Sequence, residues 1–459
     1  MIKLPILPLT NFSKISKCDK VEIEILNTTY KFSPDAKVSG EDERLHPIFG
    51  SKVYINDELV YNIPFGLPPL LFPQGSSPLI NFINNTKFTS NLHFHGLINT
   101  GLIDGASSFS TFGHNTSLGK NVKLQFPTIK NNSALTWYHS HAMFRSIELA
   151  CAGMIGTVLI TDKMTKELNN LFVYGDNYFV LTLLDADFDN EGRQVLSNLP
   201  VDINRSCFTV VNGISTIQWY SNSDNKIPFS NTLEHDTNKN LVKIDIINFG
   251  SNWRVYYLGV CDENKNILPF YVIQTDQGLC EPVLTKMQFI PVAGRISILV
   301  DLTTINNAQI FFYDYDLTEN FGINPDGTAV FPDFNLESST PFPTPIPDPT
   351  NINQQSLQST LDYPIIPIIP QVNLLMVNGI CPPPESNFIR PFLYLKNNST
   401  NSVSNKINLD SVLKIINNII YKNCDIVKDN NNYLTNLNSD YYYNLPNPSE
   451  TTPIRNICL

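Results

Sequence analysis

The feature that most constrains the fold is a succession of short runs of β-branched and aromatic residues, separated by clusters of Pro, Gly, Asn and Asp. Residues 21–163 contain runs such as VEIEI, KVYIN and NVKLQF, and residues 171–317 repeat the pattern with LVKIDIIN, PFYVIQTD and GRISILVDL. Runs of this length favour strands, and their spacing is typical of an antiparallel sandwich or barrel. We therefore expect an all-β protein with two tandem strand-rich domains.

The composition changes after residue 318. Of the 32 Pro residues in the chain, 12 fall between Phe331 and Pro384, and a Pro-rich segment is extended and semi-rigid. The predicted organisation is a first domain at 1–165, a second domain at 166–318, a Pro-rich linker at 319–395 and an Asn-rich insertion or tail at 396–459.

One short helix is expected within the Asn-rich segment. Apolar side chains recur there at helical spacing, at Val412, Ile415, Ile416, Ile419 and Ile420. This period predicts an amphipathic helix of about three turns whose apolar side packs against the rest of the protein.

Charge and hydropathy exclude two classes of partner. The net charge of −11 repels a phosphate backbone, and the chain has no basic run of five residues, so we expect no nucleic acid partner. No stretch approaches the roughly 18 apolar residues that cross a bilayer. The N-terminal apolar run is broken by Pro5 and Pro8, which is unlike a signal peptide, so we expect synthesis in the cytosol.

Histidine is rare in this chain but concentrated in two places. Four of the seven His residues form two H-x-H pairs, His93 with His95 and His139 with His141. On a strand, side chains at i and i+2 point to the same face, so each pair presents two imidazoles side by side, as a metal site requires. Copper, zinc, iron and nickel all accept imidazole ligands, so the pairs alone predict a metal without choosing it.

The motifs around these histidines resemble those of a known family. The segments H-x-H-G, I-D-G-A, W-Y-H-S-H and A-G-M-I-G-T-V-L-I are similar to the first cupredoxin domain of the multicopper oxidases, which include laccases, bilirubin oxidases and spore-coat laccases. The segments TVVNG, YVIQTDQGLCEPV and PVAGRISILVDL resemble the middle domain of that family. The resemblance covers residues 20–318 and implies tandem cupredoxin-like Greek-key β-sandwiches that belong to copper-binding oxidoreductases.

Carried over by position, the resemblance implies copper ligands. His93 would bind a type 2 copper, and His95, His139 and His141 would bind the paired type 3 coppers of a trinuclear cluster. Asp104 matches a carboxylate near that cluster that helps to deliver protons, although a turn Asp before Gly105 explains it equally well.

The remaining family ligands are missing from this sequence. The second domain is expected to hold no metal ligand, the eight Cys residues have no His neighbour, and no His follows His235. His46, His114 and His235 match no family ligand and are expected in the surface or loops. The resemblance therefore implies half of a trinuclear copper site and no type 1 copper, with affinity falling as the pH drops through the usual His range near 6.5.

Two functions remain open. In the first, a third cupredoxin domain or a homo-oligomeric assembly completes the site, and the protein is a laccase-like oxidase with dioxygen as acceptor, although the 459-residue chain alone is expected to be inactive. In the second, the chain is a non-catalytic structural scaffold, incorporated into a virion surface layer or coat.

Overall fold

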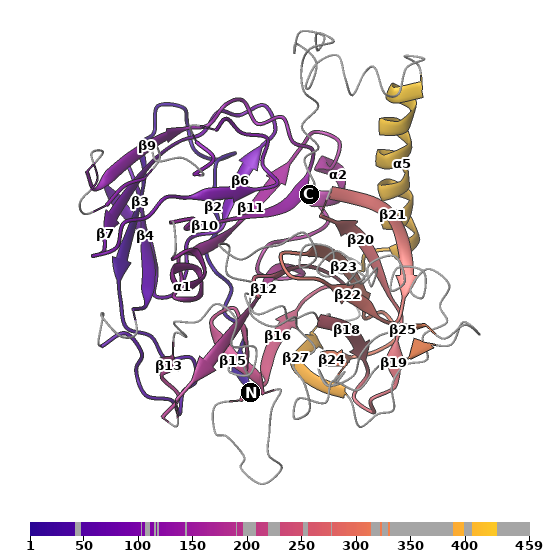
Figure 1. Ribbon diagram of the computed structural model, residues 1–459. Helices are drawn as coiled ribbons and strands as arrows, with labels where there is room; N and C mark the ends of the chain where they lie inside the picture. The colour runs from indigo at the N-terminus through magenta and orange to yellow at the C-terminus, as the bar shows by residue number, and fades with distance from the viewer. Residues whose placement is uncertain are drawn as a thin grey trace, which may run out of the picture.

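The computed structural model describes residues 1–41, 47–101, 103–105, 111–113, 116, 119–142, 145–189, 191–195, 208–218, 230–250, 256–276, 278–313, 322–323, 329–330, 389–398 and 406–428. Over these residues the protein forms two β-sandwiches that lie against each other, with one long helix at the side of the second (Figure 1). The expected all-β, tandem-sandwich architecture is confirmed.

The first sandwich is built from two five-stranded sheets. Its strands are β2 (Thr10–Asn11), β3 (Val21–Asn27), β4 (Phe49–Ile55), β5 (Glu58–Ile63), β6 (Leu70–Pro73), β7 (Leu79–Asn85), β8 (His93–His95), β9 (Asn121–Gln125), β10 (Ala134–His139) and β11 (Ile155–Thr161). One sheet has the order β5-β4-β3-β7-β9 and the other β2-β6-β11-β10-β8. In β3, Val21, Ile23 and Ile25 alternate into the core, which is the period that a sandwich strand requires.

The second sandwich is larger. Its strands are β1 (Ile2–Lys3), β12 (Tyr178–Phe188), β13 (Gln194–Val195), β14 (Phe208–Val211), β15 (Ile214–Gln218), β16 (Leu233–Thr237), β17 (Leu241–Asn248), β18 (Tyr256–Cys261), β19 (Ile267–Leu268), β20 (Phe270–Thr275), β21 (Gly278–Thr285), β22 (Gln288–Ile290), β23 (Arg295–Asp301), β24 (Asn307–Tyr313) and β27 (Ile389–Asn397). One sheet follows the order β1-β16-β27-β24-β18-β19 with β22 beside β18, and the other follows β15-β14-β12-β17-β23-β20-β21 with β13 beside β12. A separate ribbon pairs β25 (Gly322–Ile323) with β26 (Ala329–Val330).

Two strands of the second sandwich come from outside the range 166–318. Strand β27 lies between β16 and β24, so the end of the predicted linker is a sheet strand, while residues 331–388 lie outside the described part of the chain. Strand β1 pairs in parallel with β16, so the first residues of the chain do not belong to the first sandwich. Strand pairing across long sequence separations has no local signal, which explains both differences.

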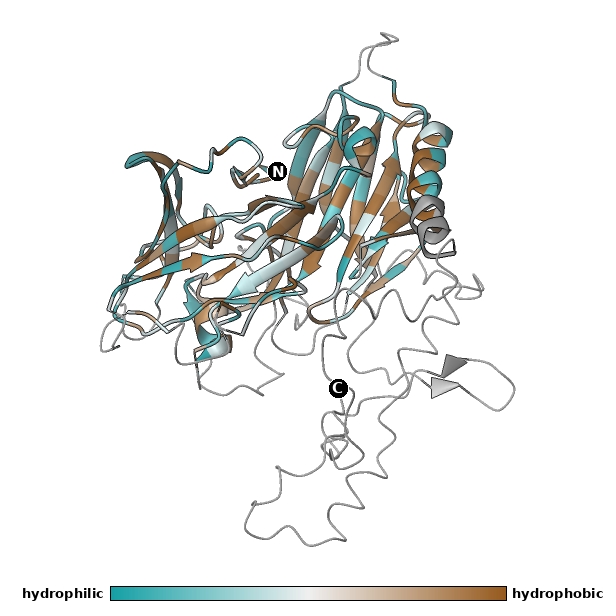
Figure 2. Cartoon of the chain, turned by 90° about the horizontal axis from the view of Figure 1, so that it is seen from above, coloured by the Kyte–Doolittle hydropathy of each residue, from teal (hydrophilic) through white to brown (hydrophobic). Residues whose placement is uncertain are grey.

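The predicted helix is present and is longer than expected. Helix α5 (Leu409–Lys428) has 20 residues, about 30 Å of helix rather than three turns. Val412, Ile416 and Ile419 are buried against the second sandwich, together with Leu168 and Phe172 from around α2 (Lys166–Asn169). In Figure 2 the helix runs along the outside of this sandwich. It is a packing helix, as its apolar spacing predicts.

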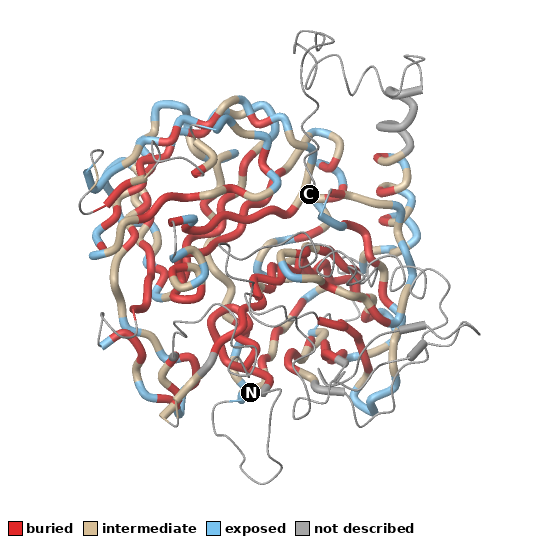
Figure 3. Tube along the Cα trace, viewed as in Figure 1, coloured by how far each residue is buried: buried red, intermediate tan, exposed pale blue. Residues whose placement is uncertain are grey.

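The two sandwiches share an apolar interface. Trp137 and Ile155 of the first sandwich belong to the same buried cluster as Leu184, Ile247 and Phe249 of the second, and Figure 3 shows the buried strands that run through this region. A small cavity of about 40 Å³ remains there.

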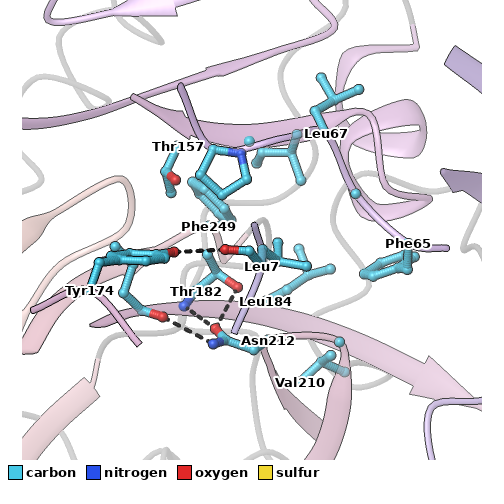
Figure 4. A pocket seen from close by; sticks show the side chains of 16 residues that line it. Leu7, Phe65, Leu67, Thr157, Tyr174, Thr182, Leu184, Val210, Asn212 and Phe249 are labelled. Carbon is cyan, nitrogen blue, oxygen red and sulfur yellow. Dashed lines mark hydrogen bonds between the residues drawn. The ribbon is translucent and has the colours of Figure 1, made fainter. Parts of the chain in front are cut away.

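The N-terminal segment runs across this interface. The Tyr174 hydroxyl donates a hydrogen bond to the carbonyl oxygen of Leu7, at 3.0 Å, and the Asn212 amide donates one to the carbonyl of Pro5, at 2.8 Å. Figure 4 shows Leu7, Tyr174 and Asn212 around the small cavity. Because β1 then pairs in one sandwich and β2 in the other, this segment ties the two together.

No helix in the described part of the chain is long and apolar enough to cross a membrane.

Candidate metal centre

Two neighbouring strands position the histidines. Strands β8 and β10 are antiparallel, with His93 opposite His139 and His95 opposite Trp137, and His141 follows β10 two residues later. Since paired residues share a face of a sheet, these rings all lie on one face. The intervening Phe94 and Tyr138 stack on each other at 5.1 Å on the other face, inside the core.

The four imidazoles lie together. Ring centroids are 4.5 Å apart for His93 and His95, 5.2 Å for His93 and His141, 5.8 Å for His93 and His139, 5.0 Å for His95 and His139, and 5.7 Å for His139 and His141. The structure therefore brings together the two pairs that the sequence singled out.

Backbone carbonyls orient two of the rings. The Nδ1 atom of His93 is 2.6 Å from the carbonyl oxygen of Asp104, and the Nδ1 atom of His139 is 2.7 Å from that of Ser140. A carbonyl oxygen only accepts, so both Nδ1 atoms carry the proton and both Nε2 atoms keep a lone pair. Metal-binding histidines are held in this way, because the hydrogen bond fixes the tautomer and the direction of the ring.

His95 and His139 form the closest pair. Their Nε2 atoms are 2.9 Å apart, and two nitrogens at that distance subtend about 90° at an ion held by bonds of about 2.0–2.1 Å. Burial, with the neighbouring His139 and His93 rings, lowers the pKa of His95 to about 3, and burial lowers the pKa of His139 to about 4. Both rings are therefore neutral near pH 7, which is the form that binds a metal.

Asp104 stands beside His93. Its Oδ2 atom is 3.4 Å from His93 Nδ1, and burial raises the pKa of the Asp104 carboxyl. The next residue, Gly105, has a φ of 73°, and a Cβ there would lie 2.0 Å from the carbonyl oxygen of Leu92. The absence of a side chain at Gly105 therefore lets the turn pack closely against the start of β8. The same turn places Asp104 next to His93.

Asn91 was missed by reasoning from sequence alone. Its amide nitrogen donates to the carbonyl oxygen of Gly105, at 2.5 Å, and its Oδ1 accepts from the backbone N–H of His141, at 2.8 Å. This buried side chain therefore connects the I-D-G turn to the H-S-H segment. In the sequence, only the position of Asn91 two residues before His93 could have indicated this role.

Residues of the second sandwich pack beside the histidines. The indole of Trp137 stacks on His95 at 3.8 Å and 6°, and packs against Phe249 of the second sandwich at 5.4 Å. The guanidinium of Arg295 donates to the carbonyl of Leu135, at 3.4 Å. The carboxylate of Asp276 accepts a hydrogen bond from the backbone N–H of Arg295, at 2.6 Å.

The other histidines lie outside this cluster. His235 is buried on β16, its Nε2 donates to the carbonyl of Asp176 at 2.5 Å, and burial lowers its pKa. It is therefore not the surface or loop residue that was expected, because β16 is an internal strand between β1 and β27. His46 and His114 lie outside the described residues.

The donor set offers pairs of ligands. Within the described ranges, no group of three or more His, Cys, Asp or Glu side chains is arranged to hold one ion. Imidazole nitrogens are nevertheless ligands that copper accepts. The closest contact in the set is the one between the Nε2 atoms of His95 and His139, at 2.9 Å.

Two sandwiches with a histidine cluster on adjoining strands define a tandem cupredoxin protein. Residues 52–165 match the family model described as multicopper oxidase. The bilirubin oxidase of Albifimbria verrucaria is 25% identical over 301 residues, covering 62% of this chain and 48% of that protein. The predicted resemblance to the multicopper oxidase family is therefore confirmed.

Other similarities agree with this resemblance. The cell division protein FtsP of Xenorhabdus nematophila is 27% identical over 208 residues, covering 42% of this chain and 39% of that protein. The crystal structure of McoA multicopper oxidase from Aquifex aeolicus matches with a TM-score of 0.53 and 20% identity, covering 69% of this chain and 61% of the other, and shows the shared fold. The chain spans about half the length of the bilirubin oxidase that it matches.

Proposed function

We propose that this chain binds copper through His93, His95, His139 and His141, as one half of a trinuclear site. The observation that carries the proposal is the convergence of four imidazoles, with neighbouring centroids 4.5–5.8 Å apart, on one face of β8 and β10. The hydrogen bonds of His93 and His139 to backbone carbonyls add support, because they put the proton on Nδ1 and the lone pair on Nε2.

Each residue has a proposed role. His95 and His139 share one type 3 copper, since their Nε2 atoms are 2.9 Å apart. His141 binds the second type 3 copper, and His93 binds the type 2 copper. When bound, copper would supply one-electron redox chemistry toward dioxygen. Asp104, whose Oδ2 atom is 3.4 Å from His93 Nδ1, would help to deliver protons to the site.

The proposed activity is that of a laccase-like oxidoreductase, completed by a further cupredoxin domain or by a homo-oligomeric partner. The relatives named as bilirubin oxidase and multicopper oxidase favour this activity. The 459-residue chain alone is proposed to be inactive, because the sequence contains no Cys with a neighbouring His for a type 1 copper.

A structural function is the second candidate. Its support is the similarity to FtsP, which is named for cell division rather than for oxidation. On this proposal the sandwiches act as an assembly scaffold, such as a virion surface layer or coat, and the histidines bind no functional metal.

The test is copper content. The purified chain is loaded with copper, dialysed and measured by elemental analysis, beside a His95→Ala/His141→Ala variant and a His46→Ala/His114→Ala control that removes the same number of histidines. The copper proposal expects one or two ions in the wild type and in the control, and a loss of copper in the first variant. Equal copper in all three proteins, or none in the wild type, would favour the scaffold.

A further inference from the structure

A second, larger cavity lies between the sandwiches, away from the histidines. It has a volume of about 180 Å³. Ala134, at the start of β10, is one of its lining residues, and His139 ends the same strand. Five residues of strand span about 16 Å, so the cavity is separate from the proposed copper site.

One wall of the cavity is polar and comes from the second sandwich. Lys243 and Asp245 lie two residues apart on β17, and their charged atoms are 2.8 Å apart. The Asp245 carboxylate also accepts from the Tyr178 hydroxyl, at 2.8 Å, and from the Ser297 hydroxyl, at 2.5 Å. Three donors thus satisfy this buried carboxylate, and its charge is compensated within the wall.

Gln274 supplies an unused donor on the same wall. It lies on β20 in register with Ser297, which is in turn in register with Asp245. Gln274 is 3% exposed, and its Nε2 atom is buried without a hydrogen-bond partner. A buried amide N–H without a partner destabilises a protein, so it indicates a missing acceptor.

The rest of the lining comes mainly from the first sandwich and is mixed in polarity, with Asn11, Ser133 and Thr161 beside an apolar part. Leu71 and Leu159 line this apolar part, and Phe172 adds an aromatic ring. The volume exceeds the roughly 150 Å³ of a cavity that accommodates benzene.

We propose that this cavity binds a small neutral organic molecule with an apolar body and one hydrogen-bond-accepting oxygen. The oxygen accepts from the Gln274 amide, and the body packs on Leu71, Leu159 and Phe172. The ligand is neutral because the Lys243–Asp245 pair is already compensated, and a further buried charge would have no partner.

Acetophenone and cumene are suitable probes, since they have the same number of heavy atoms and differ in the carbonyl oxygen. Their dissociation constants are measured by calorimetry on the full chain and on three variants. Gln274→Leu removes the donor at similar volume, and Ala134→Leu adds bulk to the wall. Gln309→Leu is the matched control, because Gln309 is buried elsewhere in the second sandwich.

We expect both probes to bind the wild type. In Gln274→Leu, the dissociation constant of acetophenone divided by that of cumene should rise about tenfold. The ratio stays unchanged in the Gln309→Leu control, and Ala134→Leu weakens both probes. The proposal is overturned if neither probe binds the wild type, if Gln274→Leu leaves the ratio unchanged, or if Ala134→Leu binds both probes as tightly as the wild type.

Discussion

Copper should stabilise the folded chain, and the histidine cluster should account for the whole effect. A ligand that binds only the native state adds RT ln(1 + [L]/Kd), which is about 2.7 kcal/mol at a hundredfold excess over Kd. For a chain with two sandwiches of this size, each kcal/mol raises the melting temperature by about 1.5 °C. The wild type should therefore gain about 4 °C at pH 7, where His95 and His139 are neutral because burial lowers their pKa values to about 3 and 4.

The perturbation is His95→Ala/His141→Ala, which removes one member of the 2.9 Å nitrogen pair and a neighbouring ring. The assay is calorimetric melting with and without copper, so that any stability lost with the stacking of His95 on Trp137 cancels in the comparison. We expect a shift below about 1 °C in this variant. A copper-induced shift equal to that of the wild type would refute the reasoning.

Four further predictions follow from the contacts described above. Gly105→Ala should lose about 2 kcal/mol or more in urea unfolding, because its φ is 73° and its Cβ would lie 2.0 Å from the Leu92 carbonyl; a loss below about 0.5 kcal/mol would contradict this. Ile416→Ala should cost about 2–5 kcal/mol, while the exposed Lys414→Ala stays within about 0.5 kcal/mol; similar losses would show that α5 does not pack as described. Burial lowers the folded-state pKa of His235, so the unfolded chain binds the proton more readily. The metal-free protein should therefore lose stability as the pH falls below about 6.5, by at most about 1.4 kcal/mol per pH unit for this group. If His235→Gln leaves the dependence of the unfolding free energy on pH unchanged, this reasoning is wrong. The copper-loaded 459-residue chain should show no intense blue absorption and no turnover of a phenolic dye; a blue protein would overturn the absence of a type 1 site.

Copper held by His95 and His139 as proposed should be released at a lower pH than the sequence indicates, which a pH titration of bound copper measures. Ordinary histidines would release the metal near pH 6.5. The pKa values of His95 and His139, lowered by burial to about 3 and 4, allow this pair to keep its lone pairs in more acidic solution. Burial of a strand end is a property of the assembled sandwiches and is not visible in H-x-H spacing.

The sequence by itself determined which side chains share a face. The two-residue period of a strand places His93 with His95, and it directs Phe94 and Tyr138 into the core. The same period predicted two sandwiches, and the helical spacing of Val412 and its neighbours predicted α5. These features are local, because each depends only on residues a few positions apart.

Only the tertiary structure decided which distant segments meet. Strand β27 enters the second sandwich beside β24, and Asn91 connects the I-D-G turn with the H-S-H segment. The run LVKIDIIN predicted a strand. It did not show that Lys243 and Asp245 would line the cavity between the two sandwiches. Such pairings are set by the packing of two complete sheets, whose energy depends on contacts between residues far apart in the chain.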